Sequence, residues 1–176
     1  LAAPGDAWEP FEPLELRSVG GAGFRRSEDG TWFVEGKLPA RDTYEFETLV
    51  PADRLGGIRL EVLPDASLAG GGGFGRAGNG NVVVTKIEAE IEPPGDGKVI
   101  PVELVRAEAT YEQDGWPAAS VLDTKGEKGK GWGIDGQDPA RREPRRIGLF
   151  PSRTVPLPEN SRLVVRIRQE AIDGHT

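Results

Sequence analysis

The feature that most constrains the fold of this chain is a period-two alternation of apolar and polar side chains, which recurs along its length. Residues 85–91, "TKIEAEI", alternate aliphatic side chains with Lys and Glu. Residues 42–50, "DTYEFETLV", alternate Tyr44, Phe46 and Thr48 with charged side chains. This pattern is typical of strands that bury one face, and no stretch of ten or more residues has the periodicity of a helix. The alternation therefore predicts a protein built from strands.

Further segments of the same kind are separated by turns rich in Gly and Pro, which number 25 and 15 among the 176 residues. They are residues 30–36, 57–64, 102–112, 145–151 and 161–169. Short strands at this spacing indicate an all-β fold, an antiparallel β-sandwich or jelly roll. The length fits one domain, which we place at residues 14–176 after an N-terminal extension of residues 1–13.

A glycine-rich segment, "GGGGFGRAGNG" at residues 70–80, contains the G-x-G-x-x-G spacing of a dinucleotide-binding turn. That turn functions only when a helix follows it, because the helix N-terminus holds the pyrophosphate. Here Asn79, Gly80 and a β-branched segment follow instead. We interpret the segment as a turn between strands.

Charge and residue usage exclude several functions. The net charge of −7 argues against nucleic-acid binding, and no apolar stretch reaches the ~18 residues of a membrane span. The absence of Cys excludes disulfides and an attached c-type haem on this chain. His175 is the only histidine and lies next to the chain end, so we expect no histidine-based active site and no enzyme. A hydrolase that uses two of the 29 acidic residues stays a third possibility.

The basic run "ARREPRR" at residues 140–146 is the local exception to the acidic composition. A solvated loop is one interpretation. The alternative is a contact with an anion or a sulfated glycan, because guanidinium groups offer paired donors to sulfate and phosphate.

Three long loops are expected at residues 64–80, 92–98 and 123–144, and the two outer ones are where we expect a site. Trp116, in the turn "DGWPA", is the expected aromatic platform for a sugar ring. Gln113, Asp114 and Arg76 are expected to add hydrogen bonds. Trp132 is either a second aromatic contact or a plug in the core. Trp32, in mid-strand, is expected in the core.

A structural calcium ion is a further expectation. Asp123 ends an apolar segment, and Asp135 and Asp138 follow after a Gly/Lys-rich loop. Calcium takes six to eight oxygen ligands, which these carboxylates and nearby carbonyls could supply. The alternative is that each of the three aspartates only stabilises a turn.

Several segments, in this order, resemble one region of large planctomycete surface proteins that carry c-type cytochrome modules and uncharacterised planctomycete domains. They are "GTWFVEGKLPARDTYEFET", "LGGIRLEVLPDASLAGGGGFGRAGNGNVVVTKIEAEI", "ATYEQDGWPAASVLDTKGEKGKGWGID" and "SRLVVRIRQ" with a later "GH". The resemblance covers most of residues 14–176. It implies an extracytoplasmic β-sandwich, and a final strand after the histidine that this chain lacks.

The segment "ASVLDTKGEKGKGWGI" is also similar to an element of discoidin-type, galactose-binding-like sandwiches. Together these features suggest a non-catalytic carbohydrate-binding module of an extracytoplasmic multidomain protein, with a polysaccharide and neighbouring domains as partners. The alternative is a structural spacer or protein-docking domain that binds no sugar. Trp116 and Trp132 on a common concave surface would favour the first, and burial of both would favour the second.

Overall fold

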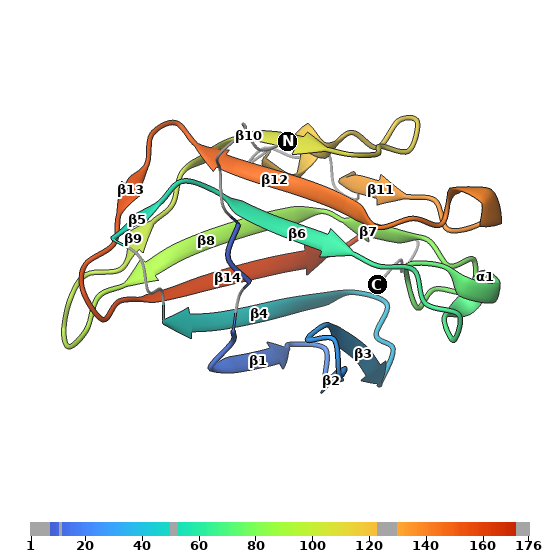
Figure 1. Cartoon of the computed structure of the whole chain (residues 1–176), viewed down its shortest axis with the longest axis horizontal. Helices are drawn as coiled ribbons and strands as arrows, with labels where there is room; N and C mark the ends of the chain where they lie inside the picture. Colours follow the sequence, from blue (N-terminus) through green and yellow to red (C-terminus); the bar gives the residue numbers. More distant parts are fainter. Residues whose placement is uncertain (1–7, 11, 50–52, 123–129, 172–176) are drawn as a thin grey trace.

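The protein is an all-β structure with several antiparallel sheets, consistent with a β-sandwich (Figure 1). The computed structural model describes residues 8–10, 12–49, 53–122 and 130–171. The strands are β1 (Glu15–Ser18), β2 (Ala22–Arg26), β3 (Trp32–Gly36), β4 (Asp42–Leu49), β5 (Arg54–Leu55), β6 (Ile58–Val62), β7 (Val82–Val84), β8 (Lys86–Glu92), β9 (Ile100–Pro101), β10 (Leu104–Ala109), β11 (Trp132–Ile134), β12 (Arg145–Pro151), β13 (Val155–Pro156) and β14 (Arg162–Gln169). Helical structure is limited to α1 (Ala69–Gly72) and the 3₁₀ turns η1 (Ala118–Leu122) and η2 (Pro139–Arg141).

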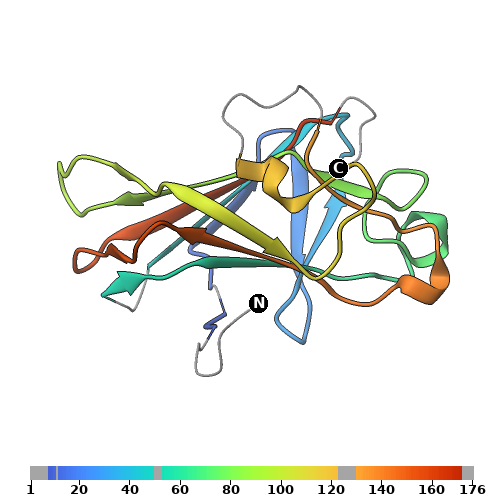
Figure 2. The same ribbon diagram turned by 90° about the horizontal axis from the view of Figure 1, so that it is seen from above.

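Two main sheets form the layers (Figure 2). One has five strands in the order β1-β4-β14-β8-β9, and the other has three in the order β10-β12-β6. The pairs β11–β7, β13–β5 and β2–β3 form separate two-stranded ribbons. None of the described segments forms a helix long and apolar enough to cross a bilayer.

The core lies between the two sheets and is filled by the apolar half of each alternating strand. The buried side chains of the five-stranded sheet and of the facing sheet belong to one cluster. Its members include Ile87, Ala89, Ile91, Leu163, Val165 and Ile167 from the first sheet, and Ile58, Ile147 and Leu149 from the second. The predicted alternation in β4, β8 and β14 is therefore confirmed as the pattern that separates core from surface.

The outer face of the five-stranded sheet carries the charged half of the same strands. The arginines of β14 lie between the glutamates of β4 and those of β8, and Arg17 of β1 lies on the other side of β4, so that the ion pairs cross the sheet. These pairs are Arg17–Glu45, Arg166–Glu45, Arg166–Glu90, Arg162–Glu47, Arg162–Glu92 and Arg168–Glu88. Opposite charges on neighbouring strands thus favour the observed register.

The glycine-rich segment packs backbone against backbone. A Cβ atom on Gly75 would lie 2.0 Å from the carbonyl oxygen of Asn81, and one on Gly136 would lie 2.2 Å from that of Gly80. The Asn81 side chain accepts a hydrogen bond of 2.9 Å from the Gly136 amide. The chain then continues into β7 and not into a helix, so the interpretation as a turn is confirmed.

Two predicted boundaries differ from the structure. The alternating segment at residues 85–91 is preceded by an apolar run that could extend it, but residues 81–91 form two strands: Thr85 bonds to Arg168 of β14 and to the Glu170 amide just after it, while β7 leaves the sheet to pair with β11. The segment 123–144 was expected to be a loop, but its described part contains β11 and η2. In both segments the secondary structure is set by pairing with residues that lie far away in the sequence.

The close glycine packing predicts different effects for two glycines of the same motif. Gly75→Ala should lower the free energy of unfolding by about 1–3 kcal/mol, because the new methyl group meets fixed backbone. Gly78→Ala should change it by less than about 0.5 kcal/mol, since no atom lies within 4 Å of its Cβ position. Urea unfolding measures both, and equal losses would contradict this account of the motif.

The charged face predicts a loss of stability in acid. Burial raises the pKa of the Glu45 carboxyl, but hydrogen bonds from Arg166 and Arg17 outweigh it, so the pKa lies below its ordinary value of 4.5. A depressed folded-state pKa stabilises the protein above pH 4.5, and this contribution is lost as the pH falls through the folded-state value.

Glu45→Gln should therefore lower the free energy of unfolding at pH 7 by on the order of 1 kcal/mol and flatten its fall towards about pH 3. Glu159→Gln, an exposed residue on the turn before β14, is the control. Urea unfolding at several pH values checks this, and parallel curves for the wild type and Glu45→Gln would show that the ion pairs add nothing.

Candidate ligand-binding site

The predicted aromatic platform lies in a tight turn that is docked on β11. The amide of Trp116 donates to the carbonyl of Gln113 at 2.9 Å, and Gly115 has a φ of 77°, as the third residue of a type II turn requires. The Gln113 amide donates to the Gly133 carbonyl at 3.1 Å, and the Gly133 amide donates to the Trp116 carbonyl at 3.2 Å. The structure therefore brings Gln113, Asp114 and Trp116 together.

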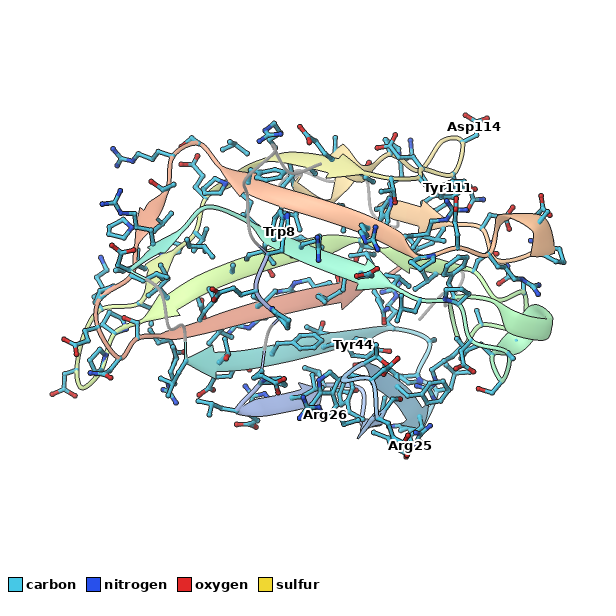
Figure 3. All side chains as sticks on the ribbon, in the orientation of Figure 1. Trp8, Arg25, Arg26, Tyr44, Tyr111 and Asp114 are labelled. Atoms are coloured by element: carbon cyan, nitrogen blue, oxygen red, sulfur yellow. The ribbon has the colours of Figure 1, made fainter. Side chains whose placement is uncertain are left out.

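Trp116 is half-buried, because its side chain rests on Gly133. A Cβ atom at Gly133 would lie 2.7 Å from the Cβ atom of Trp116. Asp114 is exposed at the tip of the turn (Figure 3). Part of the Trp116 ring therefore stays open to solvent beside a free carboxylate.

Trp132 has no exposed surface, and its indole Nε1 donates to the carbonyl of Tyr111 at 2.7 Å. The expectation that it contacts a ligand is wrong, because its place in β11 points the ring into the core. The alternative, a plug in the core, describes its position. Trp116 and Trp132 thus share no binding surface.

Arg76 lies apart from this turn. Its guanidinium donates to the carbonyls of Gly36 and Lys37, at 2.7 and 2.8 Å, and so ties the glycine-rich loop to the end of β3. It also lies beside Tyr44, whose pKa is raised to about 12 by burial and by Asp42, with Arg76 opposing the rise. The β2–β3 ribbon lies across the sandwich from Asp114 (Figure 3), so Arg76 does not join the Trp116 turn.

The expected calcium ligands are only partly described. Asp135 accepts a hydrogen bond from the Gln137 amide at 2.9 Å, and Asp138 accepts one from the Ala140 amide at 3.0 Å, as the turn-forming alternative predicted. Asp123 lies outside the described residues. Among the residues that are described, no three acidic or histidine side chains gather as a metal site would need, so calcium binding stays a prediction.

The basic run is divided among intramolecular contacts. Arg142 donates to the carbonyls of Gly136 and Gly71 and joins the two outer loops. Arg145 is buried over the Tyr111 ring, 4.3 Å from its centroid, and Arg146 pairs with Glu61 at 2.7 Å. These three arginines therefore hold the fold together and form no open anion site.

A hollow of about 420 Å³ opens beside β1, between that strand and the β2–β3 ribbon. Its size lies within the range of small-ligand sites. The half-buried Trp32 is its largest side chain, and most of the other lining side chains are apolar. The lining residues are Pro13, Leu14, Leu16, Arg17, Ser18, Ala22, Gly23, Phe24 and Trp32.

Trp32 reaches this hollow because the β2–β3 ribbon packs on the main sheet at only one end. Phe24 lies edge-on to Tyr44, with ring centroids 5.2 Å apart, and Val34 is paired with Phe24. Trp32 is on the same face of the ribbon but next to its turn, where it meets the segment before β1. The expectation that Trp32 lies in the core is therefore wrong. Its side chain is on the face of the ribbon that carries Phe24 and Val34, but it lies past the end of the main sheet and is only partly buried.

A buried carboxylate holds Ser18, one of the residues that line the hollow. Asp42, 4% exposed, accepts hydrogen bonds from the Ser18 hydroxyl at 2.5 Å and the Gly20 amide at 2.7 Å. The Ser18 oxygen in turn accepts from the amides of Gly21 and Ala22, both at 2.9 Å. These bonds hold the turn between β1 and β2, next to the hollow, in place.

Two pairs of opposite charges flank the hollow. Arg26 lies over the Trp32 ring, 6.0 Å from its centroid, and bonds to Glu12 at 2.6 Å. Arg17 pairs with Glu45 and lies 3.9 Å from Glu15. No Asp or Glu is among the described residues that line the hollow.

Comparison of the sequence with family models and curated proteins, and of the fold with solved structures, finds no match. The resemblance to planctomycete surface proteins therefore stays a prediction, and the site is interpreted from its own geometry.

Proposed function

We propose that the chain is a non-catalytic carbohydrate-binding module that takes a sugar unit in the hollow beside Trp32. The observation that carries the proposal is this hollow of about 420 Å³ with a half-exposed indole on its wall. One face of a pyranose ring is rich in C–H groups, which pack well on an aromatic plane, while its edge carries hydroxyls. A surface that joins an aromatic wall to charged groups at its rim suits both parts of such a ligand.

The proposal includes the galactose-binding-like type of sandwich and a place in an extracytoplasmic multidomain protein, both of which rest on the sequence resemblance. A structural calcium ion at Asp123, Asp135 and Asp138 belongs to the same proposal but takes no part in the sugar contact. The turn of Gln113, Asp114 and Trp116 is the alternative location for the sugar, since it also offers an aromatic ring beside polar groups.

A second candidate function, protein docking, is favoured by exposed apolar side chains near the hollow. Leu14 lines the hollow and is 61% exposed, while Val19 and Leu38, on the segments that follow β1 and β3, are 75% and 51% exposed. Apolar side chains that gather on a surface often mark a contact with another protein. A neighbouring module would then cover this surface, and no sugar would bind.

Substitution of the two half-exposed tryptophans tests the location. Trp32→Ala should weaken binding to a polysaccharide at least about tenfold, because it removes the stacking surface, and Trp32→Phe should retain part of the affinity. Trp116→Ala is the matched control and should leave the affinity unchanged. Affinity electrophoresis against a panel of soluble polysaccharides, followed by calorimetry, measures the change, with urea unfolding as the check that each variant is folded.

The opposite pattern, in which only Trp116→Ala loses affinity, would move the site to the Gln113–Trp116 turn. If the wild-type protein binds no polysaccharide of the panel, the carbohydrate function is wrong. Docking would then be the better account of the exposed Leu14, Val19 and Leu38.

A further inference from the structure

We infer that the hollow selects neutral, hydroxyl-rich glycans and rejects sulfated or uronic-acid glycans. This inference rests on the proposed carbohydrate function and names the class of ligand for the same site. It follows from the charges that surround Trp32, each of which is already paired within the chain.

The two guanidinium groups at the hollow are compensated by carboxylates. Arg26, the cation nearest to the Trp32 ring, bonds to Glu12 at 2.6 Å. Arg17, the one charged residue among the described residues of the lining, bonds to Glu45 across the outer face of the sheet and lies 3.9 Å from Glu15. Each of these two guanidinium groups therefore already has a carboxylate partner, and an anion at the hollow would have to compete with that partner.

The charge on Glu45 is not lost near neutral pH. Although burial raises the pKa of its carboxyl, the hydrogen bonds from Arg166 and Arg17 lower it further, and the net pKa falls below the ordinary value. Glu45 therefore stays ionised and keeps its ion pair with Arg17. An anionic ligand would have to separate Arg17 from a partner that Arg166 also holds in place.

Hydroxyl groups fit such paired charges better than anions do. A hydroxyl both donates and accepts, so it can donate to a carboxylate and accept from the neighbouring guanidinium. A sulfate or carboxylate only accepts, and it would be repelled by the glutamate of the pair. At the outer rim these groups are reachable, with side-chain exposures of 49% and 67% for Arg26 and Glu12, and 59% and 58% for Arg17 and Glu15.

The net charge of the chain acts in the same direction. With a formal net charge of −7, the protein repels a polyanion at a distance. The one basic run, at residues 140–146, has Arg142, Arg145 and Arg146 in contacts within the fold. Long-range and local electrostatics therefore both favour a neutral ligand.

Matched polysaccharides test the selection directly. Each pair shares one backbone and differs in charge: dextran and dextran sulfate, desulfated and native carrageenan, methyl-esterified pectin and polygalacturonate. Affinity electrophoresis of the wild type and Trp32→Ala at low and moderate salt should show Trp32-dependent retardation by at least one neutral member, and at least about fivefold weaker retardation by its charged counterpart.

Removal of the rim carboxylates should change this selectivity. The double variant Glu12→Gln/Glu15→Gln leaves Arg26 and Arg17 less compensated, so it should bind the charged members at least about threefold more tightly at low salt. The gain should disappear at high salt. Glu159→Gln, which removes the same kind of charge far from the hollow, should not change the affinity for either member.

Each outcome separates the two claims. Stronger Trp32-dependent binding to the charged member of a pair would overturn the selectivity and leave the carbohydrate function intact. An absence of binding to all six polysaccharides would overturn the carbohydrate function and the selectivity with it. Equal gains from the double variant and Glu159→Gln would show that net charge, not the hollow, sets the preference.

Discussion

The structure depends on the way that β4, β8 and β14 sort their side chains. On one face, residues such as Ile91 and Leu163 fill the core between the sheets. On the other, Arg162 and Arg166 lie among glutamates of the neighbouring strands. A slip of one residue in any of these strands would put charges into the core and aliphatic groups among ion pairs. Core packing and surface charge thus specify the same register.

The hollow is a consequence of this register at the edge of the sheet. The inner face of β4 offers Tyr44 to the β2–β3 ribbon, but the main sheet ends at β1. The part of the ribbon near its turn therefore lies beside β1 and the segment before it, and Trp32 is left partly exposed. The buried carboxylate of Asp42 keeps the nearby turn rigid.

Where the alternation is long, the sequence was sufficient to predict the strands and which of their side chains face the core. It also excluded a nucleotide site, because the residues after Gly78 could not begin a helix. It could not place Trp32 or Trp132, since both lie in short apolar segments and their exposure depends on distant partners. Trp132 is buried because β11 pairs with β7, and Trp32 is only partly buried because the sheet ends at β1. The only local clue to Trp32 was its closeness to the turn at residues 27–31.

The central claim is that Trp32, and not another tryptophan, meets the ligand. The chain has four tryptophans, and their indole N–H signals can be assigned in a ¹H–¹⁵N NMR spectrum by single Trp→Phe substitutions. Titration with a neutral oligosaccharide from a polysaccharide that binds should move the Trp32 signal and leave those of Trp116 and Trp132 in place. A shift of the Trp116 signal alone, or a titration in which the Trp32 signal stays fixed, would contradict the account.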